Sequence, residues 1–462
     1  MLSLYGDDIR RKVISRRAAL QVGGLGFTGL MWADLLAKQS AAGQIGTSSA
    51  GLASTFGKAR SCILIFNYRG PSHLDLWDLK PEASAEVRGE FKPVGTNVPG
   101  IAITEHLPRL GKLADKYTII RSACHEDNDH AVGTYLALTG HPHPQSRPLG
   151  VEPSASPLDM PSLGSVVSKL RPSERPIFPY VTLGILNHLG HNDSMGQNGG
   201  CLGKTYDPYS VPAGAQNTKD VRTVLAAESG ERLGGRRTLL EQMNVSGPPL
   251  RAAGGPRSWD SYTQRAHELL SSSLSKDAFD LDKEPQKTRD LYGPIPFAQN
   301  CLLARRLVEA GVPLVTVYSV GNRDWDTHGA NFQTLKNTLL PPMDQGVSAL
   351  LEDLESRGLL AETLVVWMGD MGRTPVINKG AGRDHWSYCY SVVLAGAGIR
   401  GGQVYGSSDR RAAYPASNPV SPQDIAATIY HSLGIDPRTH LHDQQGRPLT
   451  LTTGKPVEGL FG

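Results

Sequence analysis

Residues 61–70 read SCILIFNYRG, a continuous apolar run that ends in a polar turn. A short uninterrupted run of this kind is typical of a strand buried on both faces of a parallel sheet. Comparable runs recur at Lys116–Arg121, Val312–Val320, Leu364–Met368 and Tyr390–Ala395. The sequence therefore predicts a core of buried strands that are far apart along the chain.

Two segments between these runs have the apolar spacing of amphipathic helices. Phe297–Ala310 is followed by Gly311, and Leu340–Gly358 ends in Ser-Arg-Gly, which are helix-stop signals. Strands that alternate with helices favour an α/β fold with a doubly wound, mostly parallel sheet flanked by helices. From about residue 140 to 290 the pattern weakens into Pro-, Gly- and Ser-rich stretches. We interpret this region as a loop-rich insertion that caps the sheet edge and shapes access to a site.

The composition excludes several classes of protein. The 462 residues include 47 Lys plus Arg and 44 Asp plus Glu, which gives a formal net charge of +3. Nucleic-acid binding requires a basic stripe, so we predict no nucleic-acid partner. The 51 Gly and 32 Pro indicate many turns and long loops rather than a helical bundle. The five cysteines are widely spaced without a CxxC pair, so we predict free thiols.

The N-terminal segment has the layout of an export signal. Residues 10–43 combine a basic start, a short mildly apolar stretch and a small-residue exit. Ser15–Leu20 (SRRAAL) resembles the twin-arginine signal, with Ala19 at the position usually filled by Phe. The apolar run is much shorter than the roughly 20 residues of a membrane span, so we predict no stable span after cleavage. The alternative is an amphipathic helix packed on the domain.

This interpretation sets the predicted domain boundaries and the location. Residues 1–54 are predicted to be the signal peptide and a linker, and residues 55–462 the folded domain. Twin-arginine signals carry folded proteins across a bacterial inner membrane. The sequence therefore predicts a periplasmic or secreted protein.

Potential metal ligands follow three of the predicted strands. The stretches are RDWDTHGAN (323–331), GDMGRTP (369–375) and GRDHW (382–386). Ligands of open α/β sheets gather at the carboxyl ends of the strands, and Asp and His together suit Zn²⁺ or a similar divalent ion. We predict a divalent-metal site whose candidate ligands are Asp324, Asp326, His328, Asp370 and His385.

Other candidates lie in neighbouring loops. Arg373 carries a planar guanidinium that suits a tetrahedral oxyanion such as sulfate or phosphate. The exits of the first two strands contribute His73 with Asp75, and His130 with Thr134. Alone, a loop Asp is usually a turn or cap residue and a lone His is usually solvated. Their position beside the other three loops makes these residues candidates.

Together, these motifs resemble those of the DUF1501 family, bacterial proteins of unknown function. The resemblance covers about residue 15 to the end and includes GPSHLDLWDLKP (70–81), TGHP (139–142), WDTHGANF (325–332) and GRDHW (382–386). That family is similar in architecture to the alkaline-phosphatase and sulfatase superfamily. Its enzymes hold one or two divalent metals at strand ends and transfer a phosphoryl or sulfuryl group. The resemblance thus implies an alkaline-phosphatase-like fold and a divalent cofactor, with Zn, Ca and Mn as the alternatives.

The resemblance also implies ligand roles. Asp326 and His328 match the family's Trp-Asp-Thr-His string, while Asp324 with His328 fits the superfamily's Asp-x-x-x-His ligand pair, so either Asp remains a candidate. Asp370 stands where the superfamily begins an Asp-His ligand pair, although Met replaces the His here. His385 resembles the last His ligand of the superfamily.

At the position of the nucleophile the sequence differs from the superfamily's pattern. Counting nine residues back from Thr139, as in sulfatases, reaches His130, and no Cys/Ser-x-Pro-x-Arg string occurs. Formylglycine chemistry is therefore not predicted. The alternatives are His130 as ligand or nucleophile, the hydroxyl of Thr134 or Ser72, and water activated by a divalent ion.

The sequence supports two hypotheses about function. The first is an exported metal-dependent hydrolase of small-molecule or glycan sulfate or phosphate esters. In this hypothesis Asp326, His328 and His385 hold the cation. Asp370 and the His73–Asp75 loop complete this site or a second one, and Arg373 binds the oxyanion. The second is a secreted binding or scaffold protein without turnover, favoured by the missing nucleophile and by the Met after Asp370. An oxidoreductase is a weaker third idea, because no haem, flavin or iron–sulfur spacing supports it.

Overall fold

The computed structural model describes residues 49–143, 155–184, 195–211, 272–319 and 325–462, with Gly235 and Leu269 in addition. The chain divides into two units, Met1–Ser54 and Thr55–Gly462. In the first unit the described residues form the beginning of α3 (Ser49–Thr55). The predicted export signal, much of the predicted insertion and Asp324 lie outside the described residues.

The second unit is built on an eight-stranded sheet in the order β12-β4-β11-β8-β1-β7-β5-β6. β11 runs antiparallel to β4 and β8, whereas the other neighbouring pairs are parallel. The predicted α/β fold with a mostly parallel sheet is therefore confirmed. The strands are β1 (Ser61–Asn67), β4 (Tyr117–Ala123), β5 (Tyr180–Leu183), β6 (Tyr209–Val211), β7 (Leu314–Tyr318), β8 (Thr363–Gly369), β11 (Tyr390–Ala395) and β12 (Gln403–Tyr405).

The central strand β1 explains why the sheet forms where the apolar runs lie. All seven of its residues are buried, as expected for a strand paired on both sides and covered on both faces. Ile63 and Ile65 belong to the large core cluster that includes Leu303 of α14 and Leu350 of α16. The alternate residues of β1 point to the opposite face, because side chains alternate along a strand.

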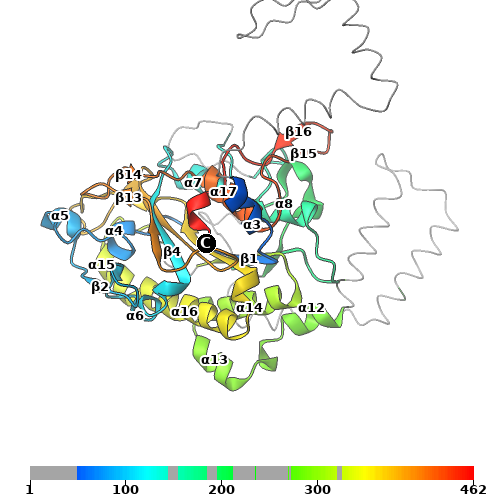
Figure 1. Ribbon diagram of the computed structural model, residues 1–462, viewed down its shortest axis with the longest axis horizontal. Coiled ribbons are helices and arrows are strands. Elements are labelled where there is room, and N and C mark those ends of the chain that lie inside the picture. The colour runs from blue at the N-terminus through cyan, green and yellow to red at the C-terminus, as the bar shows by residue number, and fades with distance from the viewer. Residues whose placement is uncertain are drawn as a thin grey trace, which may run out of the picture. The chain divides into compact units, whose positions relative to one another are not determined.

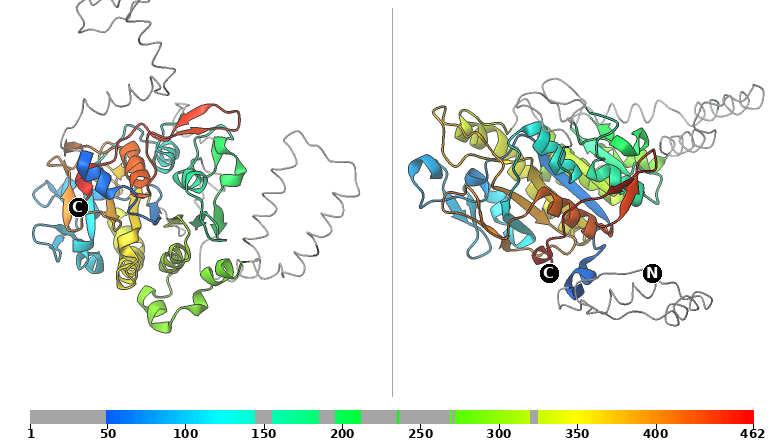
Figure 2. Two further views of the ribbon diagram at one scale, coloured as in Figure 1. Left: turned by 45° about the vertical axis from the view of Figure 1, so that its right-hand side comes forward. Right: turned by 90° about the horizontal axis from the view of Figure 1, so that it is seen from above.

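Helices cover both faces of the sheet (Figure 1, Figure 2). On one face lie α14 (Pro296–Ala310) and α16 (Leu340–Ser356), with α12 (Ser273–Ala278) and α13 (Gln286–Tyr292) packed against them. On the other face lie α7 (His130–Thr139), α8 (Leu163–Leu170) and α17 (Pro422–Ser432). α14 begins with a proline in its first turn and ends at Gly311 in the left-handed conformation, so local signals set both ends.

Part of the predicted insertion contributes to the sheet. α8, β5 and β6 all lie between residues 140 and 290, and β5 and β6 extend the sheet beyond β7. These strands were not predicted, because runs of three or four residues carry too little pattern to be distinguished from loops. Among the described residues, no helix is both long enough and apolar enough to cross a membrane.

The remaining elements are short and lie around the sheet. The helices are α4 (His73–Leu76), α5 (Ala85–Arg88), α6 (Pro108–Gly111), α15 (Asn331–Thr334) and a π-helical turn at Leu335–Leu339. The strands are β2 (Pro93–Gly95), β3 (Ala102–Thr104), β9 (Gly372–Arg373), β10 (His385–Trp386), β13 (Ser407–Ser408), β14 (Pro415–Ser417), β15 (His440–His442) and β16 (Pro448–Thr450). The 3₁₀ turns are Ala114–Lys116, Gly200–Leu202, Lys204–Tyr206, Leu281–Lys283, Leu360–Glu362 and Glu458–Leu460.

Candidate metal centre

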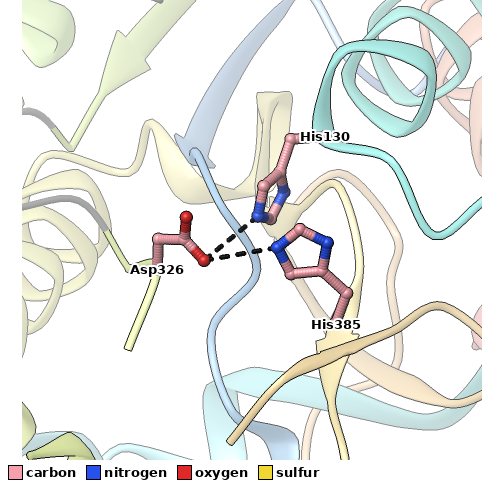
Figure 3. A group of neighbouring side chains, drawn as sticks. All are labelled: His130, Asp326 and His385. Atoms are coloured by element: carbon pink, nitrogen blue, oxygen red, sulfur yellow. Dashed lines mark hydrogen bonds and ion pairs between the residues drawn. The ribbon is translucent and has the colours of Figure 1, made fainter. Parts of the chain in front are cut away.

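Ligand-type side chains meet where β4, β7 and β8 end. His130 is the first residue of α7, whose N-terminal N–H groups at Ala131 and Val132 are capped by the side chain of Asp129. Asp326 follows Trp325, a buried anchor whose indole N–H donates to Ser319 at 2.9 Å. His385 lies in β10, opposite Arg373 in β9. Figure 3 shows the side chains of His130, Asp326 and His385 pointing toward one another.

Asp326 is the point of convergence. Its Oδ1 lies 3.3 Å from Nε2 of His130, 3.0 Å from Nε2 of His328 and 3.5 Å from Nε2 of His385. The Nε2 atoms of His328 and His385 are 3.0 Å apart. Ligands bound at about 2.0–2.1 Å to a tetrahedral zinc ion lie roughly 3.3 Å from one another. Among the described residues, His130, Asp326 and His385 form a group whose ligand atoms all lie within 4.8 Å of one another, and His328 adjoins this group through Asp326 and His385.

Each of the three imidazoles is oriented through its other ring nitrogen. The Nδ1 partners are Oδ2 of Asp370 for His130 at 2.5 Å, Oδ1 of Asp384 for His328 at 2.7 Å and the carbonyl of Asn128 for His385 at 2.9 Å. A neutral imidazole that donates Nδ1–H to such a partner presents Nε2 as an electron-pair donor, whereas the protonated ring donates from both nitrogens. This outer ring of acceptors is the usual support of metal-binding histidines.

Electrostatics keeps the centre of the cluster negative. Burial alone would raise the pKa of Asp326, but hydrogen bonds from His130 and His385 and the charge of Arg373 hold it well below its ordinary range. Burial lowers the pKa of His130, whereas the charge of Asp370 and the hydrogen bond to Asp326 raise it, with a net rise. Asp326 is therefore a carboxylate at any ordinary pH.

Arg373 is fully buried, and its donors are engaged by the protein. Nη2 lies 2.7 Å from Oδ1 of Asp326 and also donates to the carbonyl of Arg69. Nε donates to the carbonyl of Gly70 at 2.9 Å, and Nη1 to that of Arg383 at 3.3 Å. This guanidinium ties the exit of β1 to the β9–β10 ribbon. The oxyanion role predicted from the sequence requires Arg373 to face a substrate. In the structure Arg373 instead faces other groups of the protein.

Asp370 lies behind the cluster rather than in it. Its side chain is fully buried at the end of β8, and its Oδ2 contacts His130 on the side away from Asp326. Its carbonyl accepts a hydrogen bond from Nε2 of His125 at 2.6 Å. The geometry therefore supports an orienting role for Asp370 instead of the direct ligation predicted from the sequence.

The structure does not bring His73 and Asp75 into this cluster. Asp75 forms a fully buried two-bond ion pair with Arg383, at 2.8 and 2.9 Å, and also accepts from Ser72 and Asn331. Nε2 of His73 lies 2.9 Å from the carbonyl of Ala412. Such a buried pair fixes the loop around α4, and its carboxylate oxygens are already used. We therefore leave both residues out of the proposed site.

Thr134 lies one turn into α7 and is buried, with no hydrogen-bond partner for its hydroxyl among the described residues. No hydrogen bond therefore joins it to Asp326 or to the imidazoles of the cluster within the described residues. A buried hydroxyl offers a substrate no access, so the geometry gives Thr134 no nucleophile role.

Sequence reasoning missed Arg69 and Asp384. Nη1 of Arg69 lies 3.2 Å from Oδ2 of Asp326, on the carboxylate oxygen that Arg373 does not hold. In the sequence, Arg69 stands directly before Gly70 and Pro71, and a residue in such a turn carries no local sign of a role at the site. Asp384 precedes His385 directly, and this adjacency was the available signal for an orienting carboxylate.

The family description "Protein of unknown function (DUF1501)" matches residues 59–461. The chain belongs to the DUF1501 family. The family predicted from the motifs is therefore confirmed. No curated protein matches this DUF1501 chain.

Solved structures similar to this DUF1501 protein include sulfatases and members of the alkaline phosphatase superfamily. The PsFucS1 sulfatase from Pseudoalteromonas sp. is 12% identical, with 91% of this chain and 76% of that chain covered and a TM-score of 0.42. The alkaline phosphatase from the Antarctic bacterium TAB5 is 9% identical, with 82% and 99% covered and a TM-score of 0.39. The C-terminal periplasmic domain of EcEptC from Escherichia coli, in complex with Zn, is 10% identical, with 87% and 91% covered and a TM-score of 0.33.

Proposed function

We propose that this DUF1501 protein is an exported, metal-dependent hydrolase of sulfate or phosphate esters. One observation carries the proposal: three imidazoles, each oriented from behind by an acceptor, turn Nε2 toward the carboxylate of Asp326. A single histidine with a satisfied hydrogen bond would be unremarkable. Three of them around one carboxylate, at ligand-to-ligand spacing, support a metal site.

The ligand set favours one of the three metals considered. Three imidazole nitrogens with one carboxylate oxygen suit Zn²⁺, whereas Ca²⁺ and Mn²⁺ prefer oxygen-rich sets. His130, Asp326, His328 and His385 would hold the ion. A bound dication polarises an ester oxygen and lowers the pKa of water from 15.7 to about 7.

The chain's own residues hold and orient this site. Asp370 and Asp384 fix the tautomers of His130 and His328, and Arg373 keeps Asp326 ionised and in place. The side chain of His328 is 45% exposed and that of His130 only 6%, so the ester approaches from the side of His328. We therefore assign His130 to ligation and propose water as the nucleophile.

Substrate and location are the finer parts of the proposal. An ionic centre that opens to solvent suits a charged ester, on a small molecule or on a glycan. Export rests on residues 10–43, which lie outside the described residues.

The test combines metal analysis with turnover. The full chain is purified from a host with twin-arginine export, its metal content is measured, and it is assayed on a panel of aryl sulfates, aryl phosphates and sulfated glycans. We expect about one tightly held zinc ion per chain and turnover that His328→Ala abolishes. His440→Ala, an exposed histidine of β15, is the matched control and retains turnover. Less than one tightly held divalent ion per chain refutes the proposal.

A specific contact supports the second function considered, a non-catalytic binding or scaffold protein. Nη2 of Arg373 lies 2.7 Å from Asp326 and 3.5 Å from Nε2 of His130, so a guanidinium already satisfies part of the ligand set. In that case the charge of Arg373 stands in for a metal. A chain that binds no divalent ion and hydrolyses no ester, yet retains its fold, identifies this function instead.

A further inference from the structure

An ester hydrolase that acts on an anionic group requires a positive donor facing the substrate. Arg373 does not provide one, because it is fully buried and donates to three backbone carbonyls. The N-terminus of α7 does not provide one either, because Asp129 already accepts its first N–H groups. The proposed ion would face one oxygen of a bound anion, so the other oxygens of a sulfate or phosphate call for a donor from the protein.

Among the described residues, Arg69 is a second guanidinium in contact with Asp326. Its side chain is 18% exposed, equal to that of Asp326, and its Nη1 lies 3.2 Å from Oδ2 of that carboxylate. The guanidinium carbon lies 5.3 Å from the centre of the Tyr68 ring. Tyr68 in turn stands edge-on to His130, with ring centres 6.0 Å apart. The Arg69 side chain is thus partly open to solvent and lies beside the ligand cluster, in contact with Asp326.

The backbone of Arg69 is held in an unusual conformation. Its φ is +70°, a region that a residue with a long side chain rarely adopts. The carbonyl of Arg69 accepts a hydrogen bond from Nη2 of Arg373, and the carbonyl of Gly70 accepts one from Nε. Strained residues persist where the surroundings fix them, and they concentrate at functional sites. These hydrogen bonds from Arg373 hold the backbone at Arg69 and so fix the direction in which the Arg69 side chain points.

We propose that Arg69 binds the oxyanion of the ester, and that Arg373 is a positioning residue that holds Arg69 and Asp326. A planar guanidinium pairs with two oxygens of a tetrahedral sulfate or phosphate. Asp326 does not depend on Arg69 alone, because Arg373 holds its other oxygen. This inference rests on the proposed function and adds the residue that recognises the charged group.

The experiment measures binding of inorganic sulfate and inorganic phosphate to the full chain by calorimetry, with metal content determined in parallel. Arg69→Ala is compared with Arg69→Lys and with Arg60→Ala. Arg60 is the matched control, since it precedes the other end of the same strand and pairs with Glu362 with 76% of its side chain exposed.

We expect Arg69→Ala to weaken anion binding about tenfold or more, with unchanged metal content, because it removes charge-assisted hydrogen bonds. Arg69→Lys should recover part of the loss, because it keeps the charge without the fork. Arg60→Ala should bind as the wild type does. Arg373→Lys should instead lower the melting temperature and the metal content together.

Three results overturn the inference: a wild-type chain that binds neither anion, Arg69→Ala that binds them as well as wild type, or Arg69→Ala that loses the metal along with the anion. The last would make Arg69 a support of Asp326 only. Anion binding without any ester hydrolysis would refute the proposed hydrolase but leave the anion site intact, so the two failures are distinguishable.

Discussion

The acceptors behind the imidazoles allow a quantitative prediction, because Asp370 and Asp384 differ mainly in burial. Asp370→Asn and Asp384→Asn each replace a carboxylate that receives Nδ1–H with an amide of the same shape. Asp370 is fully buried at 2.5 Å from His130, whereas the side chain of Asp384 is 52% exposed at 2.7 Å from His328. Water and salt screen the second pair and not the first.

For Asp370→Asn we expect zinc affinity to fall by about 10–100-fold, the usual cost of losing an outer-shell partner. For Asp384→Asn, the range of exposed ion pairs, about 0.2–1 kcal/mol, corresponds to about fivefold at most. Competition with a chromophoric chelator measures both affinities, and the melting temperature of the metal-free chains controls for folding. Equal zinc affinity for wild type and Asp370→Asn would refute the reasoning about oriented imidazoles.

Three further predictions concern stability. Arg305→Leu should lower the free energy of unfolding by about 3–5 kcal/mol in urea, since buried Arg305 lies 2.7 Å from Glu284 and 2.8 Å from Asp353; a loss under 1 kcal/mol would contradict this. Burial alone would raise the pKa of Glu284, but the hydrogen bond and charge of Arg305 lower it on balance. The ionised Glu284 therefore stabilises the folded protein above about pH 4.3, and this stabilisation is lost as the pH falls through the lowered pKa of the folded state. The unfolding free energies of wild type and Glu284→Gln should therefore converge in acid, and a constant gap would exclude this cause. Gly164→Ala should cost about 1–3 kcal/mol, because the added methyl overlaps the ring of Tyr180; a melting temperature equal to wild type would show that α8 moves aside.

Much of the sheet could be predicted from local pattern, and its exceptions have a physical cause. The bounds predicted for β11, Tyr390–Ala395, match the structure because a continuous apolar run reports burial directly. Its direction could not be predicted, since burial is the same for a strand running either way. β8 and β11 are joined by a segment without a crossover helix, and such a connection permits antiparallel pairing.

The candidate site was predictable in its ligand types and not in its pairings. Asp326, His328 and His385 follow or precede buried strands, so topology alone brings them to one rim. Asp75 appeared equivalent, but it pairs with Arg383, a residue 308 positions away whose side chain lies in the interior. Nothing in local sequence announces a buried ion pair across that separation. The same holds for Arg373, whose burial follows from the close approach of three loops.

The reversed direction of β11 places its first residue at the rim where β8 ends. The chain between Gly369 and Tyr390 therefore leaves and re-enters the sheet on the same side, carrying His385 on its return path. Its tip, residues 379–381, is exposed to solvent. Insertions or deletions there would change the surface around Asp326 and His385 while every strand stays in register. This returning segment is therefore a place where the surroundings of the proposed site can change while the scaffold stays the same.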